Sequence, residues 1–99
     1  MNIELKKWEK YPALDDDAIR FRRLTKHSMI IAVEVSRIIN NDEYGWDLGW
    51  SFIIYDMKKQ FSESVDNIET KELAMFMADL KLIMLGYDLE DPFDLQCIL

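Results

Sequence analysis

Hydrophobic residues between positions 16 and 40 recur every three or four residues, which is the spacing of one buried helix face. The positions concerned are Ala18, Phe21, Leu24, Ile31, Val35 and Ile38, and Ser28 occupies the position of the stripe between Leu24 and Ile31. Asp15, Asp16 and Asp17 can cap the free amide groups at the start of a helix. The pattern predicts a helix over residues 16–40. Because Ile31, Val33 and Val35 also alternate as in a strand, the strand alternative stays open.

The next hydrophobic segment, residues 47–63, also fits two periodicities. One helical face would carry Trp50, Ile53, Ile54, Met57 and Phe61. A strand face would carry Trp46, Leu48, Trp50, Phe52 and Ile54. The longer helical pattern favours a helix over residues 47–63. If both segments are strands instead, residues 29–55 form a β-hairpin.

The third segment predicts a helix over residues 69–86. Asp66 or Thr70 can begin it, and Gly86 can supply the left-handed residue that ends it. Its main apolar stripe, which we expect in the core, is Leu73, Phe76, Met77, Leu80, Ile83, Met84 and Tyr87. A second apolar face on the opposite side carries Met75, Ala78, Leu82 and Leu85. We expect this second face to be covered by the C-terminal tail, by the N-terminal segment, or by a second subunit, and it is the predicted self-association surface.

These segments together predict an all-α fold, a small three- to four-helix bundle. The chain of 99 residues suits one domain, residues 1–99, with an acidic and apolar C-terminal tail over residues 87–99. The alternative is an α+β fold with a hairpin over residues 29–55.

Charge divides the chain into two unequal parts. Residues 1–40 carry 8 basic and 6 acidic side chains, whereas residues 41–99 carry 4 basic and 13 acidic ones. The basic cluster of Arg20, Arg22, Arg23 and Lys26 predicts a salt-bridge network within the chain or between subunits. An acidic protein with a pI near 4.6 lacks the broad basic face that direct nucleic-acid binding needs. The expected partner is therefore a basic or nucleic-acid-binding protein, or a second copy in a homodimer, and neither a nucleic acid nor a membrane.

Two acidic and aromatic stretches are candidate partner-binding sites. The first lies within DEYGWDLGW and contributes Asp42, Glu43, Trp46 and Asp47. The second is the run that follows the third helix, with Tyr87, Asp88, Glu90, Asp91, Phe93 and Asp94. A calcium loop is a poor interpretation of the first stretch, because Tyr44 occupies a ligand position and Ser51 stands where a bidentate glutamate has to complete the coordination.

No motif for catalysis is present in the sequence. His27 is the only histidine and has cationic neighbours, no serine has a nucleophile-elbow context, and three glycines cannot build a phosphate loop. Cys97 is the only cysteine, and the N-terminus has no signal-like apolar run, so we expect a cytoplasmic protein.

The sequence thus predicts a small acidic protein-interaction module, not an enzyme, without metal or cofactor. It would bind and occupy a partner, as immunity proteins, antitoxins and phage-encoded inhibitors do. The alternative is a structural homo-oligomer that associates through the third helix, and the remote alternative is a carboxylate enzyme with a divalent metal.

Overall fold

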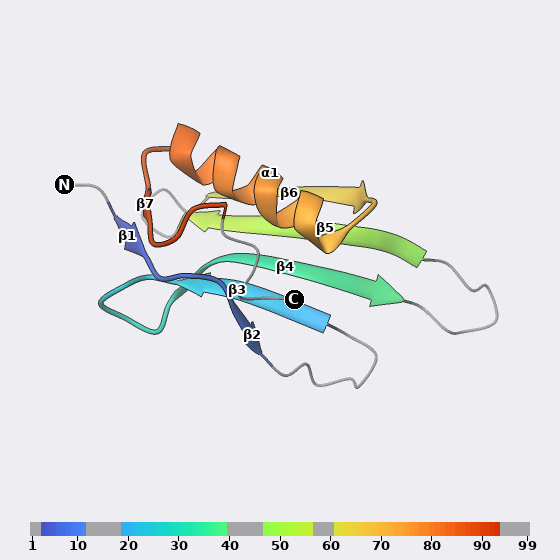
Figure 1. Ribbon diagram of the computed structural model, residues 1–99, viewed down its shortest axis with the longest axis horizontal. Coiled ribbons are helices and arrows are strands. Elements are labelled where there is room, and N and C mark those ends of the chain that lie inside the picture. The colour runs from blue at the N-terminus through green and yellow to red at the C-terminus, as the bar shows by residue number, and fades with distance from the viewer. Residues whose placement is uncertain (1–2, 12–18, 40–46, 57–60, 94–99) are drawn as a thin grey trace.

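The structure, a computed structural model, describes residues 3–11, 19–39, 47–56 and 61–93. The elements in chain order are β1 (Glu4–Leu5), β2 (Glu9–Tyr11), β3 (Ile19–Leu24), β4 (Ile31–Ile39), β5 (Asp47–Asp56), β6 (Phe61–Ile68), α1 (Lys71–Met84) and β7 (Asp88–Leu89). Strands β2 to β6 form one antiparallel sheet in sequence order, and β1 pairs with β7 in parallel (Figure 1).

The predicted all-α helical bundle is therefore wrong. Strands β3 and β4 lie within the helix expected over residues 16–40, and strands β5 and β6 cover most of the helix expected over 47–63. The α+β alternative is closer, because β4 and β5 pair antiparallel as the predicted hairpin over residues 29–55 requires.

Side chains along the central strands alternate between the two faces of the sheet. Val35 pairs with Phe21 on one side and with Phe52 on the other, and all three are buried in the core. The next residue along, Glu34, pairs with Arg22 and turns to the opposite face. This two-residue period and the β-branched side chains favour strands, and the cross-strand pairs stabilise the sheet.

The basic cluster on β3 is split by the same alternation. Arg20 and Arg22 share the face that points away from the core, where Arg22 Nε lies 2.7 Å from Glu9 Oε1 and Arg20 Nε lies 3.9 Å from Glu34 Oε1. The side chain of Arg23 lies on the opposite face of β3, toward the core, and is fully buried. The predicted salt-bridge network within the chain is confirmed, but on a strand and not on a helix.

The third predicted helix is confirmed as α1. Thr70 is its N-cap, and its hydroxyl accepts a 3.1 Å hydrogen bond from the amide of Leu73. At the other end Gly86 adopts a φ of 94°, and the amide of Tyr87 donates to the carbonyl of Leu82 at 3.1 Å. This is the Schellman arrangement that a glycine after the last turn favours.

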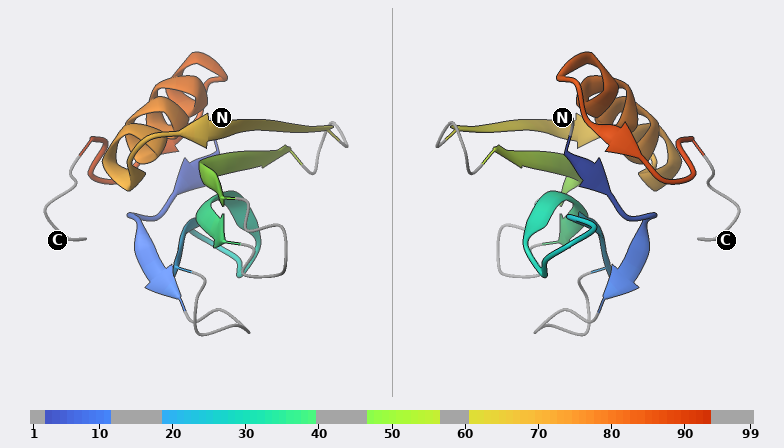
Figure 2. Two further views of the ribbon diagram at one scale, coloured as in Figure 1. Left: turned by 90° about the vertical axis from the view of Figure 1, so that its right-hand side faces the viewer. Right: turned by 90° about the vertical axis from the view of Figure 1, so that its left-hand side faces the viewer.

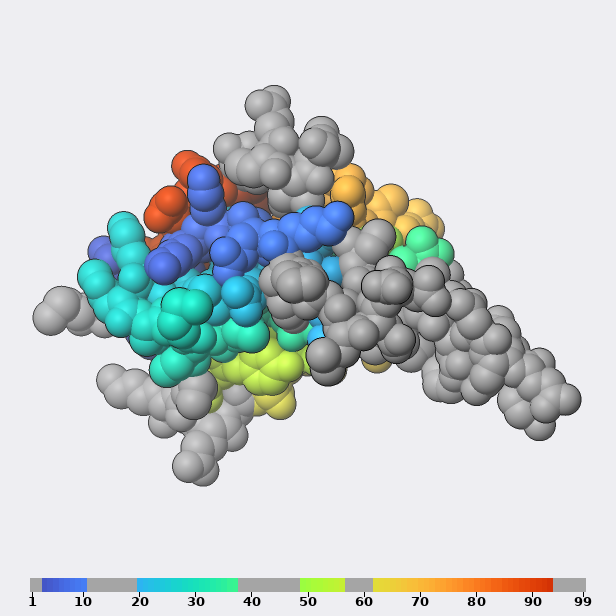
Figure 3. Space-filling model, turned by 90° about the horizontal axis from the view of Figure 1, so that it is seen from below, coloured from blue at the N-terminus to red at the C-terminus, as the bar shows by residue number. Residues whose placement is uncertain are grey.

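Helix α1 covers one face of the sheet, where it contacts β4, β5 and β6 (Figures 1 and 2). The N-terminal segment extends this cover toward β3, since the amide of Lys6 donates to the carbonyl of Leu24 at 2.8 Å. Figure 3 shows this segment in blue, between the cyan β3–β4 region and the C-terminal residues in orange and red. Across the described ranges, no helix has the length and apolar character that a membrane span requires.

Candidate interaction surface

Helix α1 is apolar on both sides, but the side that packs against the sheet is the opposite of the one that the sequence pattern predicts. Met75, Ala78 and Leu82 are fully buried against the sheet, together with Ala74 and Asp79. Three of the four residues predicted for self-association are thus part of the core, and the fourth, Leu85, is 39% exposed. A second copy of the chain cannot reach the three buried residues without removing the helix from the sheet.

The physical reason for this orientation is the size of the side chains. Ala74 and Ala78 are one turn apart and small, so the helix backbone can approach the large side chains of Trp50, Phe52 and Ile54 on β5. With bulky residues on both sides of the helix, the periodicity alone does not show which side packs more closely.

The other side of α1 forms the outer helix surface, which is the candidate interaction site. It consists of Leu73, Phe76, Leu80, Ile83 and Met84, each between 43 and 73% exposed, and of Phe93 beside them. The rings of Phe76 and Phe93 lie 5.0 Å apart between centroids. A continuous exposed apolar surface of this kind is typical of an association site.

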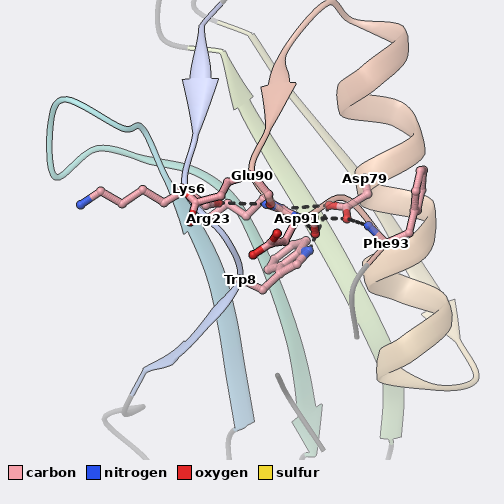
Figure 4. Close-up of polar contacts among 7 residues, drawn as sticks. All are labelled: Lys6, Trp8, Arg23, Asp79, Glu90, Asp91 and Phe93. Atoms are coloured by element: carbon pink, nitrogen blue, oxygen red, sulfur yellow. Dashed lines mark hydrogen bonds and ion pairs between the residues drawn. The ribbon is translucent and has the colours of Figure 1, made fainter. Parts of the chain in front are cut away.

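A buried polar cluster holds the segment that carries Phe93 (Figure 4). Arg23 donates from Nε and Nη2 to the two carboxylate oxygens of Asp79, at 3.0 and 2.9 Å. Its guanidinium also donates to the carbonyls of Lys6 at 2.9 Å, Glu90 at 2.6 Å and Asp91 at 3.3 Å. One arginine thereby joins β3, α1, the N-terminal segment and the chain that follows β7.

Asp79 completes the same cluster as an acceptor. It binds the indole Nε1 of Trp8 at 3.0 Å and the backbone amide of Phe93 at 3.0 Å. Both charged side chains of the pair are fully buried and their polar atoms are satisfied by protein groups, so this cluster is structural. Its effect on the surface is to hold Phe93 against Phe76.

The acidic run predicted as a partner site is held from behind by this cluster. The side chains of Asp88, Glu90 and Asp91 are exposed, while the backbone of the last two is bound by Arg23. Tyr87 is buried and is not part of the exposed run. The carboxylates of this run therefore extend from a backbone whose position is fixed.

The remaining predicted site residues belong to the segment that leads into β5 and to the C-terminal tail. Asp42, Glu43, Trp46 and Asp94 lie outside the described residues, and Asp47 is described only as the first residue of β5. In the parts of the chain that the structure describes, no three His, Cys, Asp or Glu side chains are grouped so that they could hold a metal ion. The remote alternative of a metal-dependent enzyme thus gains no support from these residues.

Comparison of the chain with protein-family models, with curated proteins and with solved structures finds no significant match. We therefore infer function from the surfaces of the protein itself.

The sequence pattern identified the five helix residues of the outer helix surface but placed them in the core, and it assigned Phe93 to the partner-binding run, where its 38% exposure is consistent with a surface position. A signal for the correct orientation was present: Ala74, Ala78 and Asp79 fall on one side of the helix, and small residues indicate close packing. Asp79 on the same side of the helix as these alanines was a second signal, since a buried carboxylate needs a cationic partner such as Arg23.

Proposed function

We propose that this protein is a non-enzymatic interaction subunit that associates with a second copy of itself through the outer helix surface. The observation that carries the proposal is the exposure of five large apolar side chains along one side of α1, continued by Phe93. Leaving such a surface in water costs free energy that association would recover.

The spacing of the exposed residues fits a paired helix. Leu73, Phe76, Leu80 and Ile83 follow one another at intervals of three, four and three residues, which is the seam of a two-helix coiled coil. A two-fold axis would pair identical surfaces. In an antiparallel pair the two helix dipoles would point in opposite directions, so that each positive end lies beside a negative end. The seam carries no charged side chain, so two copies meet there without repulsion.

Sedimentation at micromolar concentration tests this proposal. The chain should behave as a species of twice 11.8 kDa, and Leu80→Glu should convert it to a monomer because two carboxylates would face each other at the interface. Ile30→Glu is the matched control, since Ile30 is 43% exposed and Leu80 45%, but Ile30 lies in the turn between β3 and β4. A wild-type chain that stays monomeric, or equal effects of the two variants, would contradict the proposal.

A second candidate function rests on the acidic run. Exposed carboxylates on a backbone held by Arg23 suit the binding of a basic protein, as in inhibitors and immunity proteins that occupy a partner's working surface. This function predicts that a basic protein is retained at low salt by the wild-type chain and by Leu80→Glu. The double variant Glu90→Gln, Asp91→Asn should lose it, and retention by this variant would contradict the candidate.

A further inference from the structure

A pocket of about 680 Å³ lies between β1, the turn joining β3 to β4, the end of β5 and the start of β7. The volume is within the range that small-molecule ligands occupy. The apolar part of its wall consists of Ile3, Ile30, Ile31, Ala32, Tyr55 and Tyr87. None of these residues belongs to the outer helix surface, so binding here is independent of the proposed self-association.

The charged groups of the pocket wall are compensated within the protein. Lys26 Nζ is 4.0 Å and His27 Nε2 is 3.6 Å from Glu4 Oε2. Asp56 and Asp88, the other two carboxylates of the wall, each have interactions within the protein as well. Among the described residues of the wall, no charged side chain is thus left without a partner. A charged ligand would lose its hydration here without gaining a free counter-charge, so the wall disfavours anions and cations alike.

The hydroxyl groups of the pocket are also used by the protein. The hydroxyls of Thr25 and Ser28 hydrogen-bond to each other, and Ser28 Oγ accepts a 3.3 Å hydrogen bond from the amide of Ile30. The phenol of Tyr87 donates to the Asp56 carboxylate. What the wall offers to a ligand is therefore mainly apolar contact.

The apolar side chains are held in place by backbone hydrogen bonds. The amide of Thr25 donates to the carbonyl of Ile30 at 2.9 Å and closes the turn, and the amide of Lys26 donates to the carbonyl of Glu4 at 2.9 Å and joins the turn to β1. Ile3 and Ile30 nevertheless stay 42 and 43% exposed. A ligand would remove this apolar area from water without having to order the chain around it.

We propose that this pocket binds an uncharged small molecule with a compact hydrocarbon body, aromatic or branched. Contact with the isoleucine and tyrosine side chains supplies the affinity, and the compensated charges of the wall supply the selectivity against ions. Binding involves no chemical reaction.

Amide NMR of the full chain, titrated with three compounds that share one hydrocarbon body, tests this site. The compounds are 4-isopropylbenzyl alcohol, which is neutral, 4-isopropylbenzoate, which is anionic, and 4-isopropylbenzylammonium, which is cationic. Both ions should bind about fivefold more weakly than the alcohol, because a charge loses hydration in the pocket without finding a free partner. The amides that shift should be those of the pocket residues, and shifts confined to α1 would contradict the site.

Two neighbouring substitutions in the turn assign the binding to the pocket wall. Ile30→Ser removes an apolar side chain from the wall and should weaken binding of the alcohol about fivefold, since part of the contact area is lost. Met29→Ser is the matched control, because Met29 is 75% exposed in the same turn and does not line the pocket, and it should leave binding unchanged. The proposal is overturned if the alcohol does not bind, if either ion binds as tightly as the alcohol, or if both substitutions weaken binding equally.

Discussion

At the residue scale, the most consequential side chain is Arg23, which the strand period turns into the core. Burying two charges has a large desolvation cost, and the pair is tolerated because Arg23 and Asp79 meet in two parallel hydrogen bonds and bind additional backbone groups. Trp8 also lies against the guanidinium, whose carbon is 5.1 Å from the ring centroid. Together with the β1–β7 pair, this cluster joins the two ends of the described chain.

Removal of one partner should therefore destabilise the fold strongly. Asp79→Ala leaves Arg23 buried without its counter-charge, and we expect a loss of about 3–5 kcal/mol in the free energy of unfolding. Glu9→Ala removes the carboxylate that pairs with the neighbouring Arg22, and because that pair is exposed the loss should be about 0–1 kcal/mol. Urea denaturation followed by circular dichroism measures both, and similar losses would contradict the structural role of the buried pair.

Tyr87 predicts a dependence of stability on alkaline pH. Burial, with the charge and hydrogen bond of Asp56, raises its pKa above 10.0 in the folded state. The stabilisation that the neutral Tyr87 phenol provides is fully present below the pKa that this group has in the unfolded chain. It is lost as the pH rises through the pKa of Tyr87 in the folded state. Tyr87→Phe lacks this hydroxyl, so the variant should be less stable than wild type at neutral pH.

The sign of this effect can be measured as the difference between the urea midpoints of wild type and Tyr87→Phe. Urea midpoints should converge as the pH rises above about 10, where the phenol ionises in the unfolded chain. Midpoints that differ by a constant amount over this range would contradict the raised pKa of Tyr87.

At the element scale, α1 begins and ends at residues with specific local roles. Thr70 satisfies an amide at the first turn, and Gly86 provides the left-handed backbone after the last. These local signals explain why the helix was predicted within two residues at each end while the strands were not.

The cap can be tested by two substitutions at one position. Thr70→Ala should destabilise the protein by about 1 kcal/mol, because the amide of Leu73 loses its acceptor. Thr70→Ser keeps the hydroxyl and should cost much less. Thermal or urea unfolding measures both values, and equal losses would show that the methyl group of Thr70 matters and its hydroxyl does not.

At the scale of the whole molecule, a net charge of −7 surrounds an uncharged apolar seam. In the proposed dimer, this net charge would make two copies repel each other, and the outer helix surface would supply the apolar contact that holds them together. Salt screens the repulsion between exposed charges and leaves hydrophobic contacts intact.

Self-association should therefore become stronger as salt is added. The dissociation constant of the dimer, measured by sedimentation, should fall between low and high sodium chloride concentration. Dissociation of the dimer by salt would instead indicate that ion pairs hold the interface together.

The sequence by itself determined the features that depend on neighbouring residues. The caps, length and double apolar character of α1 follow from residues within one or two turns, and the alternation of Ile31, Val33 and Val35 already allowed a strand. Only the tertiary structure decided between strand and helix for residues 19–39 and 47–56, because the hydrogen bonds of a sheet join residues far apart in the chain. It also decided which side of α1 is buried, since that choice depends on how closely Ala74 and Ala78 approach β5, and this choice leaves Leu73, Phe76, Leu80 and Ile83 exposed for a partner.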